Sequence, residues 1–406
     1  MSRSIKILAV SPEIPKPDTA SGDRRFCALL EILAREHSVS LFSLTQGACG
    51  NDEEGKYFSL CEAIGVRGQL GHVSGLIDLL SRRRFDAGLC EFWRTSHDVC
   101  SLFRWLQPWA AVIVDSVDVH FLREETALAL GIGDSQTVAA NREKELAAYR
   151  TADAVVVVTE EDRDALERSG FVGLCFQIPN ILPIRARPSV SRARELLFVG
   201  GFKHAPNADG LLWFVREIWP AIKREVPEAS LTVVGSHPPP EVLSLSEVDG
   251  IEVKGYVSET APYLDRAAVS VAPLRYGGGM KGKVCEALAS GLPVVTTSFG
   301  AQGLQAISGE HLIIADDAEN FGQGVVGLLR DASRSERLGR SGQSLLAGLC
   351  SPRAVSKKSA EMTAWIESRP RKLLPLARWG ARSFYHRLAR SADMTTRASW
   401  GVSSQG

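Results

Sequence analysis

Short apolar runs recur along this 406-residue chain, and most are followed by a turn and a segment with helical spacing. The clearest runs are Ile5–Val10, Ala154–Thr159, Leu196–Gly201, Leu231–Gly235 and Val294–Thr297. Strands that are apolar over their whole length are typical of parallel sheets covered by helices on both faces. The sequence therefore predicts an α/β fold built from doubly wound parallel sheets.

This series of strand and helix units is interrupted once. Residues 182–194, LPIRARPSVSRAR, are polar and basic and contain prolines, a composition typical of a linker. The length of the chain also favours two domains. We predict a first domain over 1–185, a linker over 186–195, a second domain over 196–368 and a basic tail over 369–406. Two such domains side by side would place a ligand cleft between them.

A glycine-rich turn in the second half, YGGGMKGK, is the strongest candidate for a binding site. The three glycines at 277–279 leave backbone N–H groups unshielded, and Lys281 and Lys283 follow at the start of a predicted helix. Amides, a helix N-terminus and two ammonium groups together suit a phosphate. Glu286, one turn later, is placed to accept hydrogen bonds from sugar hydroxyls. The pattern indicates a nucleotide-sugar site, and the alternative is a glycine-rich loop that merely ends an ordinary α/β unit.

The sequence predicts a helix start after a proline-containing loop in the first half and another near Pro206 in the second half. In the first half, the loop SPEIPKPDTASGD ends near Gly22, and Arg24 begins a predicted helix. This loop lacks the G-x-G-x-x-G pattern, so a nicotinamide dinucleotide site is poorly supported. In the second half, Pro206 and Asn207 are predicted to open one amphipathic helix that continues to Ile222, with Asn207 as its N-cap.

Composition excludes several classes of protein. The chain has 47 basic and 47 acidic residues, so no net field favours nucleic acid. Its eight cysteines are scattered without a C-x-x-C pair or clustered histidines, which favours reduced thiols in a cytoplasmic protein. The N-terminal apolar run is too short for a signal peptide, and no run of 18 apolar residues predicts a membrane span.

Two further segments need interpretation. Residues 369–400 are basic and amphipathic, which predicts peripheral contact with an anionic membrane; packing against the first domain is the alternative. Asp162-Arg163-Asp164 matches a D-x-D metal motif, but it falls in the first turn of a predicted helix, where acidic residues are expected for the helix dipole alone. We therefore expect no metal site and no resident cofactor.

The second half resembles the retaining glycosyltransferases of family 4, which have the GT-B fold, in the segments FVGGFKHAPNADGLLWF, LTVVG, GYVSETAPYLDRAAVSVAPLRYGGG and KGKVCEALASGLPVVTTSFGAQGL. Weaker similarity covers SPEIPKPDTASGDRR, VDSVDVHFLR and YRTADAVVVVTEED in the first half. The resemblance implies transfer of a sugar from a nucleotide-diphosphate donor, with retention of configuration and without a required metal. It also implies a glycan or lipid-linked acceptor on the first domain and a role in polysaccharide biosynthesis.

The resemblance assigns roles to particular residues of the second half. The family signature is two glutamates eight positions apart; Glu286 would hold the donor ribose, whereas the first position is Gly278 in this chain. The family's Arg and Lys for the diphosphate are also unmatched, because their places fall near Gly201 and Pro206. Lys281 and Lys283 would replace them, with Arg275 or Lys203 in reserve.

In the first half, the resemblance places His120 near the donor sugar, with Asp118 as a secondary candidate. The catalytic candidates are His120, Lys281 and Glu286. The donor-binding candidates are Gly22, Gly201, His204, Val257, Arg275, Gly277, Gly278, Gly279, Lys281, Lys283 and Glu286. Two other functions remain open, a nucleotide-sugar 2-epimerase of the same fold and a non-catalytic scaffold that binds nucleotide sugars.

Overall fold

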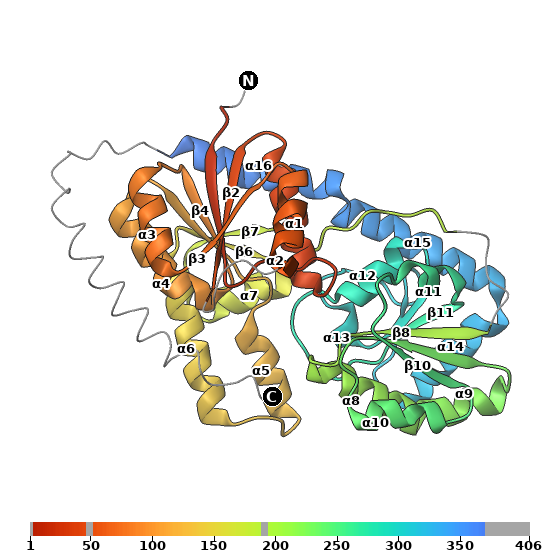
Figure 1. Cartoon of the computed structure of the whole chain (residues 1–406). Coiled ribbons are helices and arrows are strands. Elements are labelled where there is room, and N and C mark those ends of the chain that lie inside the picture. Colours follow the sequence, from red (N-terminus) through yellow and green to blue (C-terminus); the bar gives the residue numbers. More distant parts are fainter. Residues whose placement is uncertain (1–2, 46–51, 188–193, 370–406) are drawn as a thin grey trace.

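The computed structural model describes residues 3–45, 52–187 and 194–369, coloured along the chain in Figure 1. Most of the predicted linker and the predicted membrane-binding tail from residue 370 onward lie outside the described residues. Two parallel sheets form side by side, as the recurrent apolar runs predicted. The predicted class of two doubly wound Rossmann-like domains is confirmed.

The first sheet has its strands in the order β3-β2-β1-β4-β5-β6-β7, all parallel. Its interior strand β1 is apolar and almost entirely buried, as expected for a strand covered on both faces. The strands are β1 (Lys6–Ser11), β2 (Ser38–Leu44), β3 (Arg67–Gly71), β4 (Ala87–Glu91), β5 (Ala111–Asp115), β6 (Ala154–Val157) and β7 (Leu174–Gln177).

The second sheet follows the same plan, in the order β10-β9-β8-β11-β12-β13. The strand order reverses at β8, because β9 and β10 extend the sheet on one side of β8 and the later strands extend it on the other. In α/β folds, ligands bind at the carboxyl edge beside such a reversal. The strands are β8 (Glu195–Val199), β9 (Ser230–Val234), β10 (Ile251–Gly255), β11 (Val269–Ala272), β12 (Val294–Thr296) and β13 (Ile313–Ile314).

Helices cover both sheets and bury their apolar faces against them. In the first half they are α1 (Ser21–Ala34), α2 (Asp52–Ala63), α3 (Val73–Arg82), α4 (Trp93–Leu106), α5 (His120–Ala129), α6 (Ser135–Thr151) and α7 (Glu160–Arg168). From β8 onward they are α8 (Ala205–Trp213), α9 (Trp219–Glu225), α10 (Pro240–Leu243), α11 (Ala261–Arg266), α12 (Gly282–Ala289), α13 (Ser298–Ala301), α14 (Ala318–Arg330), α15 (Ala332–Cys350) and α16 (Pro352–Ser368).

The helix predicted from Asn207 to Ile222 differs from the structure at its start and in its middle. It begins at Ala205, with His204 in the N-cap position, and the side chain of Asn207 does not cap it. Residues 214–218 form a π-helical turn before α9. Pro220 explains the interruption, because it has no N–H to donate to the preceding turn.

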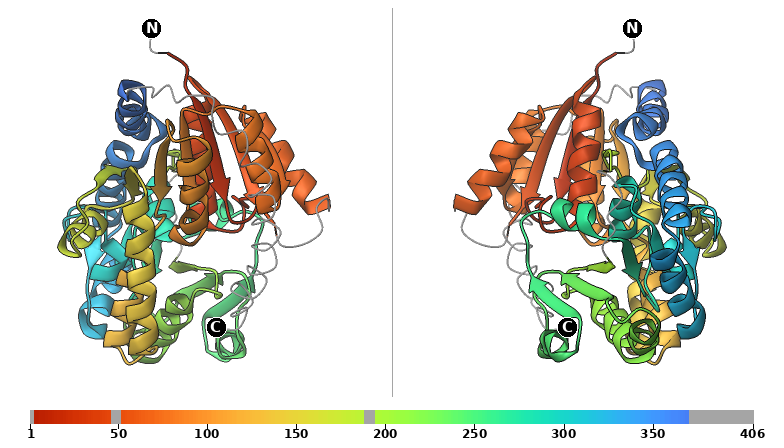
Figure 2. Two further views of the ribbon diagram at one scale, coloured as in Figure 1. Left: turned by 90° about the vertical axis from the view of Figure 1, so that its left-hand side faces the viewer. Right: turned by 90° about the vertical axis from the view of Figure 1, so that its right-hand side faces the viewer.

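Helix α16 lies on the first half of the molecule, although the sequence prediction grouped residues 196–368 together. Its buried side chains Val355, Met362 and Ile366 recur at helical spacing and join the apolar cluster of the first sheet. Figures 1 and 2 show this helix, in blue, passing alongside the first sheet after the chain leaves α15. The chain therefore connects the two halves twice.

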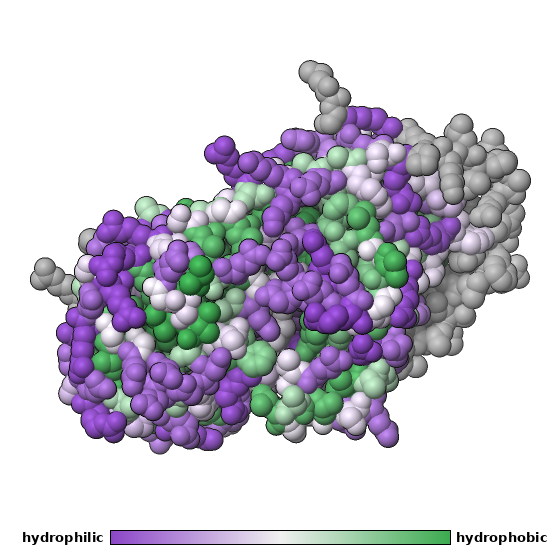
Figure 3. Space-filling view, turned by 180° about the vertical axis from the view of Figure 1, so that it is seen from behind, coloured by the Kyte–Doolittle hydropathy of each residue, from purple (hydrophilic) through white to green (hydrophobic). Residues whose placement is uncertain are grey.

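On the face seen in Figure 3, hydrophilic residues predominate and the hydrophobic residues form separate areas. Among the described residues, no helix combines the length and apolarity needed to cross a bilayer.

Candidate functional site

The glycine turn connects β11 to α12 and uses backbone conformations that other residues rarely adopt. Gly277 has φ 136° and Gly279 has φ 63°. Side chains with a Cβ are strained at such positive φ angles, so glycine is favoured at both positions. The turn follows β11 and so lies at the carboxyl edge of the second sheet.

This turn packs directly on the first half of the molecule. A Cβ atom built on Gly278 would lie 3.3 Å from Cβ and 3.5 Å from the backbone nitrogen of Arg123, in the first turn of α5. A Cβ on Gly279 would lie 3.0 Å from Cβ of Asp118. A glutamate at 278 would therefore require α5 or the turn to move by a few tenths of an ångström. The close approach of α5 gives a physical reason for glycine where the family has its first glutamate.

Lys281 holds the turn from inside. It is the N-cap residue of α12, and its side chain is only 8% exposed. Its Nζ donates to the carbonyl oxygens of Gly278 at 2.7 Å and Gly279 at 2.6 Å, and to Oε1 of Gln302 at 3.1 Å. Burial lowers its pKa to about 8. Because an ammonium group has three hydrogens, these three acceptors use all of its donors.

Lys283 has different surroundings. Its Nζ donates to Oδ1 of Asn207 and lies 5.1 Å from the ring centroid of Phe198. No carboxylate in the described part of the chain forms an ion pair with it. Part of the side chain is exposed, but protein crowds its ammonium group, and this burial, with the nearby charge of Lys281, lowers its pKa to about 7. A bound anion would favour the charged form of this lysine.

Two predicted donor-binding residues, Gly201 and His204, lie near Lys283. Asn207 donates from Nδ2 to the carbonyl oxygen of Gly201 at 2.6 Å, which ties the end of β8 to the lysine. A Cβ on Gly200 would lie 3.0 Å from Nζ of Lys283, so glycine there leaves room for the ammonium. His204 begins α8 beside them; burial and then the charges of Arg123 and Lys283 lower its pKa, although its side chain keeps an exposed edge.

Glu286 is paired across the junction of the two halves. Its carboxylate accepts a hydrogen bond from Nη1 of Arg24 on α1, and Nε of Arg24 donates to the carbonyl of Pro17 at 3.0 Å. The first turn of α1 also touches α12, because a Cβ on Gly282 would lie 2.7 Å from Cβ of Ser21. Gly22 packs nearby, where a Cβ would lie 3.0 Å from Val117. The ribose-binding candidate thus faces the first half and already has a partner there.

His120 is held on both ring nitrogens. Nε1 of Trp93 donates to its Nδ1 at 3.2 Å, and its Nε2 lies 2.8 Å from Oδ1 of Asp118. Since an indole N–H can only donate, this bonding pattern assigns the proton to Nε2. Asp118 also pairs with Arg123 at 2.6 Å. Burial alone would raise the pKa of Asp118, but His120 and Arg123 hold it well below its usual range.

Two predicted residues are not drawn into this cluster. Arg275 is exposed and pairs through two hydrogen bonds with Asp209, on its own side of the junction. Val257 packs against the apolar cluster that contains Met280 and Val284. The remaining candidates gather around the glycine turn, the start of α12 and the end of β8.

The D-x-D segment has a structural role. Asp162 and Thr159 exchange side-chain and backbone hydrogen bonds in a capping box at the start of α7. Burial raises the pKa of Asp162 to about 6. Within the residues that the structure describes, no three His, Cys, Asp or Glu side chains gather as a metal ion would need.

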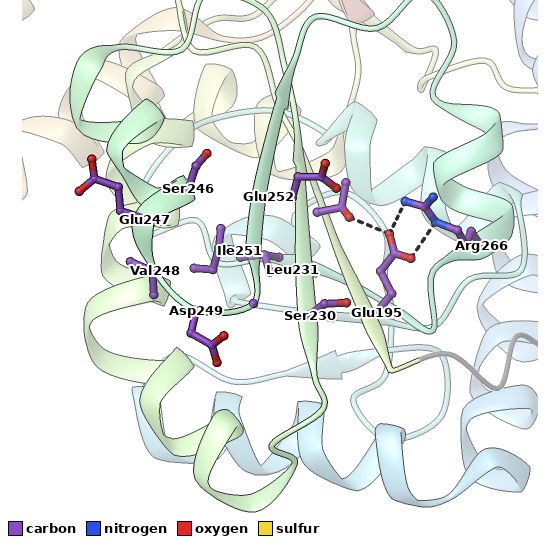
Figure 4. Close-up of a pocket in the computed structure, with 12 residues that line it drawn as sticks. Glu195, Ser230, Leu231, Ser246, Glu247, Val248, Asp249, Ile251, Glu252 and Arg266 are labelled. Atoms are coloured by element: carbon purple, nitrogen blue, oxygen red, sulfur yellow. Dashed lines mark hydrogen bonds and ion pairs between the residues drawn. The ribbon is translucent and has the colours of Figure 1, made fainter.

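The hollow shown in Figure 4, of about 460 Å³, lies elsewhere. It is lined by residues at the amino ends of β8, β9 and β10, on the edge of the sheet opposite the glycine turn. The buried carboxylate in its lining is already paired, since Glu195 accepts from Thr232 at 2.7 Å and pairs with Arg266 at 2.7 Å. Because ligands of α/β sheets bind at the carboxyl edge, we place the candidate site at the junction instead.

Sequence reasoning missed Arg123 and the role of Asn207 in this site. Arg24 lies at the helix start that the sequence predicts, and its neighbour Arg25 points in a different direction. Arg25 turns into the core, where Nη1 donates to Asp115 at 2.7 and 2.9 Å, whereas Arg24 reaches Glu286. The spacing of one residue on a helix, about 100° of rotation, separates a core ion pair from a site residue.

One comparison with known proteins matches the part of the chain that contains the glycine turn. Residues 193–331 match the family described as Glycosyl transferases group 1. A curated relative, an uncharacterized 44.6 kDa protein in a cps region of Klebsiella pneumoniae, is 25% identical over 189 residues. That alignment covers 45% of this chain and 48% of the relative, so the chain spans about half the length of the curated protein that it matches.

Solved structures share the whole fold. Anabaena HepE in complex with UDP has a TM-score of 0.70 and 11% identity, over 89% of this chain and 100% of that one. A sucrose-phosphate synthase from Thermosynechococcus elongatus has a TM-score of 0.69 and 16% identity, over 89% and 99%. S. aureus TarM, in a complex with fondaparinux, α-GlcNAc-glycerol and UDP, has a TM-score of 0.68 and 10% identity, over 90% and 100%. The fold of the chain is GT-B.

Proposed function

We propose that this protein is a glycosyltransferase that transfers a sugar from a nucleotide-diphosphate donor. The observation that carries this proposal is Lys283, a crowded ammonium group without a carboxylate partner among the described residues, at the N-terminus of α12 and the end of β8. Such a group suits an anion such as the donor diphosphate. The match of residues 193–331 and the GT-B fold support the same activity.

In this proposal the two lysines of the KGK segment have separate duties. Lys281 keeps the glycine turn in shape, and Lys283 neutralises the charge that develops as the nucleoside diphosphate leaves. Glu286 binds the ribose hydroxyls, which requires that it exchange its bond with Arg24 for bonds to the nucleotide. Because lysines and helix ends supply the positive charge, the proposed reaction needs no divalent ion.

We propose that transfer proceeds with retention of configuration and that the acceptor enters from the side of Gly22 and His120. A glycan or a lipid-linked glycan is the proposed acceptor class. TarM was solved with glycan ligands, and the Klebsiella relative is described as lying in a cps region, which support a role in polysaccharide biosynthesis. A cytoplasmic location, with the basic residues 369–400 against an anionic membrane, is part of the proposal.

The experiment begins with thermal unfolding of the protein in the presence of UDP-, GDP- and ADP-glucose. Ligand binding to the native state raises the unfolding temperature, so the preferred base should be visible. Donor turnover is then measured for the wild type and for Glu286→Gln, with Arg275→Gln as the control. We expect Glu286→Gln to weaken binding of the nucleotide about 10-fold or more, because it weakens the bonds to the ribose hydroxyls. If Glu286→Gln and the wild type bind and turn over the donor equally, the assignment of Glu286 to the donor site is wrong.

The two other functions give different results in the same assays. A 2-epimerase would change the donor sugar without transferring it, which chromatography of the recovered nucleotide sugar detects. A non-catalytic scaffold would bind the nucleotide sugar and leave it intact with every acceptor tried.

A further inference from the structure

We propose that Arg123, on the first half of the molecule, binds the donor diphosphate across the junction. This inference rests on the proposed function, and it adds a residue that the motifs of the second half do not include. It also explains how the site works without the family's own Arg and Lys.

The position of α5 brings Arg123 to the glycine turn. Its backbone nitrogen and Cβ lie 3.5 and 3.3 Å from where a Cβ on Gly278 would be, and the carbonyl of Val119 lies 3.6 Å from the same point. A side chain at 278 would fit only if this helix turn moved by a few tenths of an ångström. Glycine at 278 therefore brings an arginine of the first half to the place where the family has a glutamate.

Within residues 3–45, 52–187 and 194–369, the recorded partner of the guanidinium group is Asp118, which leaves other N–H groups for a ligand. Its Nη1 donates to Oδ2 of Asp118 at 2.6 Å, while Oδ1 of Asp118 is engaged by His120. The side chain remains 29% exposed. An arginine fork that is fixed on one side can present its remaining N–H groups to phosphate oxygens. After burial, Arg123 is the charge that lowers the pKa of His204 most, so its field reaches the start of α8.

The charges at the junction favour an anionic ligand only when Arg123 is counted. Lys281, Lys283 and Arg123 are three cations, and Asp118 and Asp162 are the carboxylates whose charges act on Lys281. Arg24 and Glu286 neutralise each other nearby. The cations therefore outnumber these carboxylates by one, and each phosphate of a sugar diphosphate carries about one negative charge. Without Arg123 the two signs would balance, and this cluster would have no excess positive charge for a phosphate.

The test measures binding of inorganic pyrophosphate, UDP and uridine by calorimetry, with GDP and guanosine or ADP and adenosine where the screen selects another base. The variants are Arg123→Gln and Arg123→Lys. Arg142→Gln is the matched control, because Arg142 on the adjacent helix α6 pairs with Glu125 and Glu143. We expect Arg123→Gln to weaken pyrophosphate and nucleoside diphosphate about 10- to 100-fold and to leave the nucleoside within about twofold, since a bond to a charged group is lost. Arg123→Lys should recover part of the loss, and Arg142→Gln should match the wild type.

The outcomes separate this inference from the proposed function. If Arg123→Gln binds pyrophosphate like the wild type while Lys283→Gln does not, Arg123 is a docking residue only and the inference is wrong, but the site stands. An equal loss of diphosphate and nucleoside affinity would also overturn it, because that would indicate a general disturbance of the junction. If Arg123→Gln does not fold, Arg123→Lys decides, with a loss of at least about threefold expected for pyrophosphate alone. A wild type that binds no nucleoside diphosphate and no pyrophosphate contradicts both proposals.

Discussion

The glycine turn and the end of β8 lie on two sides of the start of α12, and each holds one lysine of the same KGK segment. In the glycine turn, Lys281 gives all three donors to acceptors of the protein. At the end of β8, Lys283 has one amide oxygen and the face of an aromatic ring. The two lysines, two positions apart in the sequence, thus differ in how many of their ammonium hydrogens have an acceptor in the protein.

This difference divides the site into a region whose lysine has a full set of protein hydrogen bonds and a region whose lysine has charge available for a ligand. A buried cation with a full set of hydrogen bonds stabilises the loop around it. A crowded cation without a carboxylate is costly until an anion arrives. We infer that the first region gives the site its shape and the second gives it affinity for charge, and four predictions test this division.

Lys283→Gln should have the largest effect on activity. Loss of this charge removes stabilisation of the leaving diphosphate, and one such group contributes about 100- to 1000-fold to turnover. The measurement is kcat/KM with the selected nucleotide sugar. The unfolding free energy should stay the same or rise, because a cation without a carboxylate partner has been removed. A variant that keeps full activity would show that the end of β8 has no special role.

Lys281→Gln should have its largest effect on stability. The change leaves buried carbonyl oxygens of Gly278 and Gly279 without their donor, which costs about 2–3 kcal/mol of the free energy of unfolding. Urea unfolding measures this loss, and Lys283→Gln is the control. If the two variants lost stability equally, the contrast between the two lysines would not hold.

The pH dependence of donor binding should follow Lys283. Its pKa is about 7 in the free protein, and a bound anion raises it, so the complex holds a proton that the free protein has lost above pH 7. Affinity should therefore fall as pH rises above 7, by up to about tenfold per pH unit. Calorimetry from pH 6.5 to 9, in two buffers with different ionisation enthalpies, should show proton uptake on binding. Lys283→Gln should remove the part of this dependence that begins near pH 7 and leave the part near pH 8, where Lys281 titrates, whereas Arg275→Gln should retain both.

Arg275→Gln should have the smallest effect. This arginine was predicted to bind the donor, but its exposed guanidinium pairs with Asp209. Exposed ion pairs contribute up to about 1 kcal/mol, so nucleotide affinity and stability should change by less than about fivefold and 1 kcal/mol. A loss of affinity as large as that of Lys283→Gln would show that Arg275 binds the donor. Part of the positive charge of the site would then lie outside the glycine turn and the end of β8.

The sequence predicted the sheets because apolar runs such as the one in β1 have few alternatives to burial. It also predicted the glycine turn and the residues at the start of α12. It could not predict contacts between side chains far apart in the chain. Asn207 was expected to cap a helix, but it binds Lys283, and nothing local indicates that choice. Arg123 was missed because its place beside Gly278 depends on how α5 meets the other half.

The return of α16 to the first half has a consequence for synthesis of the protein on the ribosome. The apolar cluster of the first sheet includes Val355, Met362 and Ile366, which are made only after the whole second half. Domains generally fold as units as the chain emerges, so the first half must wait in an incomplete state while the second is translated. A nascent chain arrested near residue 350 should therefore expose the α1 side of the first sheet to chaperones or proteases, and one arrested far enough beyond 368 should not.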